Sequence, residues 1–267
     1  MINFSEIQDI YFILPLVGFI VGLFGTMVGG GGGFFILPVL TLLLNVPAQT
    51  AVITSLVATL PICIVGSWGH YRKNHIHFRV AALFMITGII GAFIGAGIAN
   101  SISGSELKVA FGAYSILIAL HMFFNATRKN KMEGAWTKTK LSQKNLKTLA
   151  GSFFGMVAGL ITGTFGTSGS APVLAGLFST KIPFKMVVGT SLLVVLVNTI
   201  FAVGAHFIVG KIDITLVAFL TAGSTIGALI GPRLLAKIQV GKSENKAKYA
   251  YALIMAAIGV LMILGRN

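Results

Sequence analysis

Five consecutive glycines, Gly29 to Gly33, interrupt the first long apolar stretch of the chain. An α-helix does not persist through such a run, because each interior glycine costs roughly 1 kcal/mol relative to alanine. Unpaired backbone cannot face lipid, so a break inside an apolar segment must be buried in protein or line a watery cavity. A second break, Gly163 to Pro172, lies in the other half of the chain. We interpret the rest of the sequence around these two breaks.

The composition places the chain in a membrane. Of its 267 residues, 55% are hydrophobic and only 10% are charged, whereas about 25% of the residues of a soluble domain are charged. The mean hydropathy is +0.92. Apolar runs long enough for helical spans recur along the chain, without the alternating pattern of an outer-membrane barrel. The sequence therefore predicts an all-α polytopic membrane protein.

The two halves of the chain are related by a shift of about 136 residues. Val46 to Gly95 aligns with Ile182 to Gly231 without a gap, with about fifteen identities over about fifty positions, far above chance for a repeat comparison. We therefore predict three parts: residues 1–127 form a first transmembrane repeat, 128–147 a basic cytoplasmic linker, and 148–267 a second transmembrane repeat.

Each half is predicted to contain a broken, re-entrant helical hairpin and three spans. The second piece of the first break, 34–44, is too short to cross a hydrocarbon core that needs about 20 residues. An odd number of spans gives the two halves opposite orientations, and inverted repeats with broken helices are typical of secondary transporters. The expected apolar segments are 11–28, 34–44, 50–68, 80–99, 107–124, 149–161, 172–179, 186–209, 214–229 and 249–264.

The cations predict the orientation. The net charge of +14 would suggest nucleic acid in a soluble protein, but here Lys and Arg lie between spans. In the hairpin arrangement about 17 of the 20 lie on one side, the exceptions being Lys108, Lys211 and Arg266. Basic loops favour the cytoplasmic side and anionic lipid headgroups. We therefore expect a multi-pass protein of the bacterial inner membrane, with both termini outside, no nucleic-acid partner, and a homodimer as one oligomeric option.

The breaks are also the candidate substrate site. The short helices start near Phe34 and Pro172, so their free N–H groups would converge near the middle of the membrane and suit a small anion. The alternative is that the glycines only permit close helix packing. The expected binding residues in and beside the breaks are Thr26, Gly29, Gly30, Gly31, Gly32, Gly33, Phe34, Thr164, Gly166, Thr167, Ser168, Gly169 and Ser170.

Several polar residues of the spans are further candidates. Thr54 and Ser55 recur as Thr190 and Ser191, and their hydroxyls either reach the site or bond to carbonyls of their own helices. Asn198 either lines the site or makes an interhelical hydrogen bond. His70 recurs as His206; the pair is a candidate relay or gate, although such histidines are more often interface residues.

The sequence gives no sign of an enzyme, a metal site or a cofactor. The one catalytic alternative is a rhomboid-like intramembrane protease, because Gly166-Thr167-Ser168-Gly169 fits G-x-S-G with His206 as its base. The repeat partner of Ser168 is a glycine, which argues against it. A coupling ion, H⁺ or Na⁺, is not indicated by the residues.

The duplicated pattern resembles the TauE/SafE sulfite-exporter family of membrane permeases, the toluene-sulfonate-uptake-type transporters. The resemblance rests on the glycine break leading to Leu37-Pro38, on Pro47 with Thr54-Ser55, and on the Gly91/Gly95 span, and it covers about residues 16–264. It implies transport of sulfur-containing anions such as sulfite, thiosulfate or organosulfonates. The second break departs from the family pattern by carrying Thr167 and Ser168 in place of a glycine run.

We therefore expect a secondary transporter for a small, sulfur-containing anion that works by alternating access. An anion channel of the same fold and a membrane assembly factor without transport activity remain alternatives.

Overall fold

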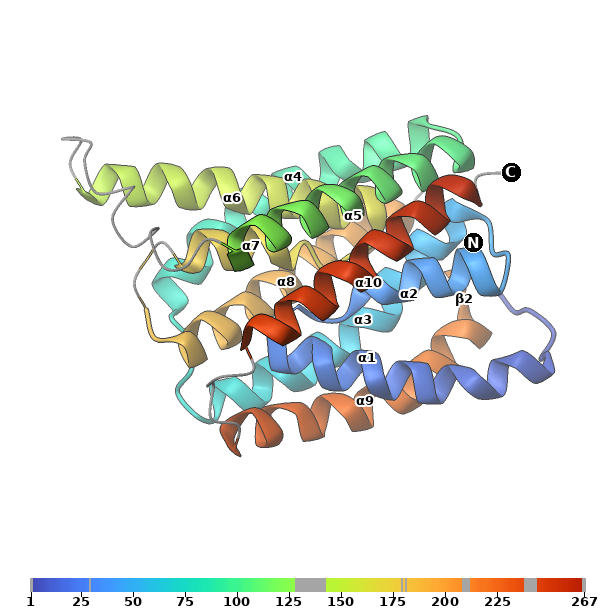
Figure 1. The fold of residues 1–267 in the computed structure, drawn as a ribbon, viewed down its shortest axis with the longest axis horizontal. Coiled ribbons are helices and arrows are strands. Elements are labelled where there is room, and N and C mark those ends of the chain that lie inside the picture. Colours follow the sequence, from blue (N-terminus) through green and yellow to red (C-terminus); the bar gives the residue numbers. More distant parts are fainter. Residues whose placement is uncertain are drawn as a thin grey trace.

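The structure is a computed structural model that describes residues 2–28, 30–127, 143–178, 180, 182–207, 212–237 and 244–265. The described part is almost entirely helical (Figure 1). Its elements are β1 (Ile2–Asn3), η1 (Asp9–Ile13), α1 (Leu14–Val28), α2 (Gly33–Pro38), η2 (Val39–Leu43), α3 (Ala48–Tyr71), α4 (Phe78–Ser101), α5 (Gly104–Thr127), α6 (Gln143–Phe165), α7 (Ser170–Phe178), α8 (Phe184–Phe207), β2 (Ile212–Asp213), α9 (Ile214–Lys237) and α10 (Glu244–Leu264).

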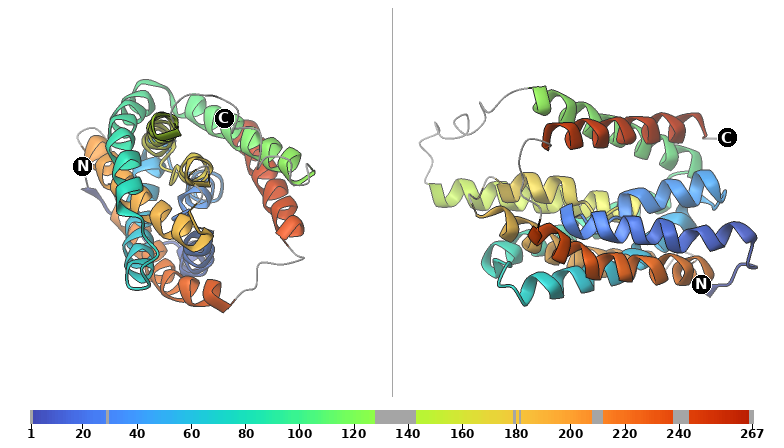
Figure 2. Two further views of the ribbon diagram at one scale, coloured as in Figure 1. Left: turned by 90° about the vertical axis from the view of Figure 1, so that its left-hand side faces the viewer. Right: turned by 60° about the horizontal axis from the view of Figure 1, so that its bottom comes forward.

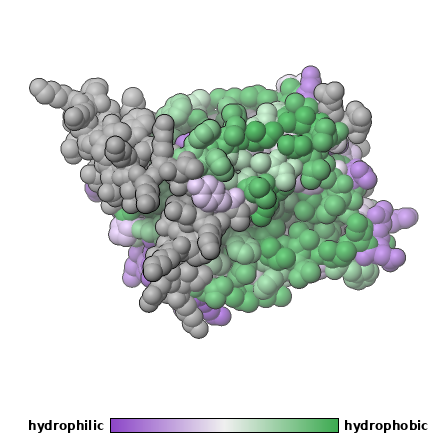
Figure 3. Space-filling model, viewed as in Figure 1, coloured by the Kyte–Doolittle hydropathy of each residue, from purple (hydrophilic) through white to green (hydrophobic). Residues whose placement is uncertain are grey.

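Six helical segments of the described part are long and apolar enough to cross a bilayer. Their outer surfaces carry large apolar side chains such as Leu16, Ile86 and Leu117, which are exposed in the isolated chain. Figure 3 shows one face of the molecule, on which apolar residues form a broad band with hydrophilic residues toward its two ends. Such a band suits lipid tails rather than water, so the protein is an all-α polytopic membrane protein.

Helix boundaries repeat along the chain at the spacing seen in the sequence. Helices α3 and α4 begin at Ala48 and Phe78, and α8 and α9 begin at Phe184 and Ile214, each 136 residues later. The short helices α2 and α7 follow α1 and α6 in the same order. In Figure 1, α1 runs from the end that holds the N-terminus toward the middle, and α2 turns back toward that end; α6 and α7 do the same from the opposite end.

Helices of each half pack mainly on helices of the other half. Helix α4 packs most extensively on α6, its counterpart α9 packs on α1, and α5 packs on α10. The α5–α10 pair lies to one side of the other helices (Figure 2). Glycines permit the close approach: a Cβ on Gly91 of α4 would meet the Met156 carbonyl of α6, and one on Gly227 of α9 would meet the Phe19 carbonyl of α1.

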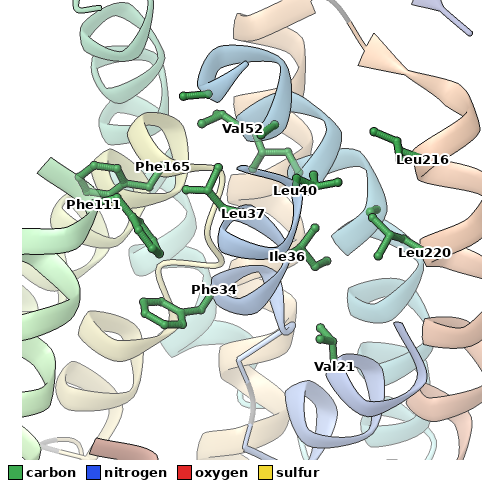
Figure 4. Packing of buried hydrophobic residues seen from close by; sticks show 14 of the residues in the cluster. Val21, Phe34, Ile36, Leu37, Leu40, Val52, Phe111, Phe165, Leu216 and Leu220 are labelled. Atoms are coloured by element: carbon green, nitrogen blue, oxygen red, sulfur yellow. The ribbon is translucent and has the colours of Figure 1, made fainter. Parts of the chain in front are cut away.

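The apolar core surrounds the first short helix. Ile36, Leu37 and Leu40 are fully or almost fully buried, and Phe34 lies against Phe111 of α5 with ring centroids 5.1 Å apart. Figure 4 shows these side chains pointing toward α3, α5 and the end of α6. This packing holds the first break in the interior, where its backbone is shielded from lipid.

Several details of the structure go beyond what the sequence predicts. Gly97 of α4, unlike Gly91 and Gly95 of the same helix, has nothing within 4 Å of its Cβ position. Helix α6 begins at Gln143, inside the predicted linker, of which 128–142 lie outside the described residues. Two helices also extend beyond the expected apolar segments 214–229 and 249–264, because α9 continues to Lys237 and α10 begins at Glu244. The chain also forms a short parallel pairing of Ile2 with Ile212 and Asn3 with Asp213.

Candidate functional site

The two breaks adopt backbone conformations that favour glycine. Gly32, immediately before α2, has φ 78°, and Gly169, immediately before α7, has φ 50°. Side chains rarely accept this left-handed region, whereas glycine enters it without steric cost. A Cβ on Gly169 would also meet the Ala158 carbonyl of α6. Both breaks are therefore specific, tightly packed turns.

A hydroxyl of α3 joins the two breaks. Ser55 Oγ lies 2.9 Å from the carbonyl oxygen of Gly166 and 3.3 Å from that of Gly33. The Thr59 hydroxyl donates to the Ser55 carbonyl at 2.7 Å. A Cβ on Gly33 would lie 3.1 Å from the Gly166 carbonyl oxygen and 3.3 Å from the Ser168 nitrogen. Residues more than 130 positions apart in the sequence thus meet at one point.

The hydroxyls of the second break face the glycines of the first. Ser168 Oγ donates to Ser170 Oγ at 3.4 Å, and a Cβ on Gly30 would lie 3.1 Å from Ser170 Oγ. Thr167 is buried, and its hydroxyl has no hydrogen-bond partner within the described residues. Ser170 is half-buried at the start of α7. The Ser168 and Ser170 side chains therefore lie where the breaks touch.

Helix α8 contributes further buried polar groups, Asn198 and Thr199. Neither the oxygen nor the nitrogen of the Asn198 amide has a partner within the described part, and the side chain packs against Gly88 of α4. Thr199 Oγ1 is likewise buried without a partner there. Buried polar groups normally pair with protein or water, so these positions favour a bound polar species. Ser191 is fully buried and has an interaction partner within the protein.

A family comparison matches this architecture. The family model described as sulfite exporter TauE/SafE matches residues 14–262. The chain belongs to the TauE/SafE family.

Relatives of this TauE/SafE protein match it over nearly their whole length. A probable membrane transporter protein of Xylella fastidiosa (strain Temecula1) is 28% identical over 263 residues, which cover 93% of this chain and 91% of the relative. The probable membrane transporter protein YdhB of Bacillus subtilis is 27% identical over 228 residues, covering 83% and 89%. One from Methanocaldococcus jannaschii is 24% identical over 267 residues, covering 94% and 95%. No solved structure matches the chain significantly.

Some predicted binding residues of the TauE/SafE protein have their hydroxyls engaged elsewhere. Thr26 donates to the Gly22 carbonyl at 2.9 Å, and Thr164 to the Leu160 carbonyl at 2.8 Å, each within its own helix. The Thr190 hydroxyl accepts from the His77 backbone N–H at 2.9 Å, as Thr54 does from Asp213 at 3.4 Å. Phe34 belongs to the apolar core, and Gly29 lies outside the described residues.

The repeated histidines differ in their surroundings. His206 is buried in the last turn of α8, and its Nε2 lies 2.6 Å from the carbonyl oxygen of Gly163, the first residue of the second break. His70 is equally buried in α3, but neither ring nitrogen has a hydrogen-bond partner within the described residues. The hydrogen bond of the Ser168 hydroxyl goes to Ser170. The contacts of Ser168 and His206 thus give no support to a Ser–His catalytic pair.

Sequence reasoning missed two residues beside the first break. A Cβ on Gly31 would lie 2.8 Å from Cys63 Sγ and 3.3 Å from Thr59 Cγ2, both on α3. The signal was available: Thr59 and Cys63 follow Ser55 at helical spacing, on the same face of α3. The part of the chain that the structure describes holds no cluster of three metal-ligating side chains.

Proposed function

We propose that this TauE/SafE membrane transporter is a secondary carrier for a small, sulfur-containing oxyanion such as sulfite, thiosulfate or an organosulfonate. The observation that carries the proposal is the meeting of the two breaks at Ser55, whose hydroxyl lies within hydrogen-bond distance of carbonyls from both. Broken helices that meet between structural repeats are where secondary transporters bind their substrates.

The binding chemistry proposed for the site is that of a neutral anion cradle. The N-terminus of α7 offers free backbone N–H groups, and Ser170 adds a half-buried hydroxyl there. Thr167 adds a second hydroxyl without a partner in the described part. Neither break contains a lysine or arginine. Because donors without a fixed full charge hold an anion less tightly than an ion pair does, the anion would be released in each cycle.

Alternating access follows, in this proposal, from two halves of inverted orientation. Gly189 near the start of α8 lies against His70 near the end of α3, so the two helices are antiparallel. The exchanged packing of α4 on α6 and of α9 on α1 gives each hairpin a partner from the other half. Rocking of these units about the breaks would expose the site to one side of the membrane at a time.

The orientation we propose places the cation-rich end in the cytoplasm and both termini outside, in a bacterial inner membrane. Lys73 Nζ donates to the Pro232 carbonyl at 3.2 Å, which brings the α3–α4 turn to the far end of α9, next to Arg233. Lys185 interacts electrostatically with His75 of the same turn. At the opposite end, Lys108 Nζ donates to the Gly265 carbonyl at 2.9 Å. Cations on one side favour that side as cytoplasmic.

Transport by purified protein in liposomes tests the proposal. Sulfite, thiosulfate, a small sulfonate, sulfate and chloride are supplied in turn, and current and radiolabelled uptake are recorded. Saturable uptake that prefers one of the sulfur anions is the expected result, and imposed H⁺ or Na⁺ gradients then identify the coupling ion. Flux that never saturates would indicate a channel. Absence of flux for every anion, by current and by label, would contradict transport of this substrate class.

A further inference from the structure

The ring nitrogens of a buried histidine at the cation-rich end have no hydrogen-bond partner among the described residues. His70 lies in the last turn of α3 with 2% of its surface exposed, and both of its ring nitrogens are buried and unpartnered. Its counterpart His206, buried to the same degree, uses Nε2 to contact the Gly163 carbonyl oxygen. Burial alone therefore does not leave a histidine unpaired in this fold. Unpaired buried imidazole is costly, which favours a bound species beside His70.

A second histidine ring lies next to the first. The chain folds back after α3, so that the His75 backbone N–H donates to the His70 carbonyl at 2.9 Å. The two ring centroids are 5.8 Å apart, and Nδ1 of His75 is also buried without a partner in the described part. The turn is fixed against α8, because the His75 carbonyl contacts Gly189 and the His77 N–H donates to Thr190. Three unpaired ring nitrogens thus lie in one fixed place.

The charges around this histidine pair are all positive. Burial and the positive charges of Lys185 and Lys73 lower the pKa of His75 below its ordinary value. His77 uses Nδ1 to accept the Val80 N–H, and Arg72 lies over the Trp68 ring at 5.9 Å. Arg79 of α4 and Arg233 of α9 are exposed at the same end. Among the described residues, none of these cations pairs with a carboxylate, so a metal cation would be repelled and an anion attracted.

We propose that His70 and His75, with the ammonium groups of Lys73 and Lys185, form a binding site for a small divalent oxyanion, and that the anion binds together with a proton taken from solvent by the histidine pair. An imidazolium presents two N–H donors, and charge-assisted hydrogen bonds to oxyanions are strong. The site is separate from the breaks, so it goes beyond the transport function proposed above and does not depend on which anion is carried.

Proton uptake follows from the electrostatics of the histidine pair. With burial, the lysines nearby and no compensating acid among the described residues, the charged form of His75 is disfavoured and its pKa is lowered. A bound dianion reverses this balance and favours the imidazolium. Because linkage is reciprocal, protonation must strengthen anion binding by the same factor. Anion occupancy at this end would therefore respond to cytoplasmic pH.

Calorimetric titration of the purified, detergent-solubilised protein with sodium sulfate tests the site. Sulfate stays fully ionised in the range used, and two amine buffers of different ionisation enthalpy report the protons taken up. We expect sulfate affinity to be about tenfold higher at about pH 6 than at about pH 8, with proton uptake on binding. The variant His75→Gln should abolish both the pH dependence and the uptake; His70→Gln is the buried companion variant. Lys185→Gln should weaken binding at both pH values and keep its pH dependence.

The control separates this site from the breaks. Ser168→Ala alters the second break only, so it should leave the pH-dependent sulfate binding as in the unmodified protein, whether or not transport survives. Wild-type protein that binds no sulfate, or a His75→Gln protein with the pH dependence intact, would overturn the proposal. Loss of the pH-dependent binding in Ser168→Ala would also overturn it, since the anion would then occupy the breaks.

Discussion

Adjacent polar residues of one helix take different roles in this protein. Thr54 and Ser55 repeat together as Thr190 and Ser191, but the Thr54 hydroxyl accepts the Asp213 N–H while Ser55 reaches both breaks. Successive residues of a helix point about 100° apart, so only one of the two can face the breaks. The sequence predicted that the pair is polar and repeated; which member faces inward depends on how α3 is rotated against its neighbours.

Replacing Ser55 tests the hydroxyl that joins the breaks. In Ser55→Ala the Gly166 and Gly33 carbonyls lose their shared donor, so the free energy of unfolding should fall by about 1–3 kcal/mol. Transport in liposomes should drop by about tenfold or more, because the interaction that holds the two breaks together is weakened by about that free energy. Ser101→Ala is the matched control, since this exposed hydroxyl contacts only its own helix at the Gly97 carbonyl. Equal transport by the two variants would contradict the role of Ser55.

The corresponding helices α4 and α9 are both capped at their N-termini by a side-chain acceptor, but the capping residue differs. His77 Nδ1 accepts the Val80 N–H before α4, and Asp213 Oδ1 accepts the Leu216 N–H at 3.2 Å before α9. The 136-residue repeat predicted these starting points well. The ends of α6 and α9 were predicted poorly, because Lys, Arg and Gln are good helix formers and a helix can continue past the lipid into its polar flanks. Apolar runs mark the hydrocarbon core rather than the helix.

The cap of α9 is testable by substitution. Asp213→Ala removes the acceptor of the Leu216 N–H, so the free energy of unfolding should fall by about 1 kcal/mol. Asp213→Asn retains an acceptor oxygen and should remain close to wild type. Thermal unfolding in detergent measures both. If Asp213→Asn lost as much stability as Asp213→Ala, charge rather than capping would explain the effect.

The contact between α4 and α6 gives a second test at this scale. A Cβ on Gly91 would meet the Met156 carbonyl, whereas one on Gly204 of α8 meets nothing within 4 Å. Alanine is favoured over glycine in a helix by up to about 1 kcal/mol, so Gly204→Ala should be neutral or stabilising. Gly91→Ala should lower the unfolding temperature, since it separates two backbones in contact. The opposite order of stability would show that the α4–α6 packing is wrong.

At the scale of the whole molecule, helix partners were beyond the reach of the sequence. Gly91 of α4 and Gly227 of α9 each approach a neighbouring backbone, but nothing in the residue types identifies α6 and α1 as the partners. The same holds for the candidate site. The breaks and their hydroxyls were predicted, while the approach of Gly33 to Gly166 depends on the packing of both halves. Residue types describe each position by itself, whereas which helix surfaces pack together depends on the fold of the whole chain.

Side-specific labelling tests the proposed orientation. The single cysteine, Cys63, is fully buried, so the unmodified protein should react little with a membrane-impermeant thiol reagent. Arg72→Cys lies at the cation-rich end and Ser105→Cys at the opposite end, both exposed. In intact cells Ser105→Cys should be labelled and Arg72→Cys protected until the membrane is opened. The reverse pattern would invert the topology.

The most direct test of the central claim compares anion uptake by two glycine variants in liposomes. A Cβ on Gly33 would lie 2.9 Å from Thr59 Oγ1 and 3.1 Å from the Gly166 carbonyl oxygen, whereas one on Gly97 has nothing within 4 Å. We predict that Gly97→Ala shows the saturable uptake of a sulfur oxyanion seen with wild type. Gly33→Ala, folded by its thermal unfolding curve, should have lost it. Normal saturable uptake by Gly33→Ala would contradict a substrate site at the meeting of the two breaks.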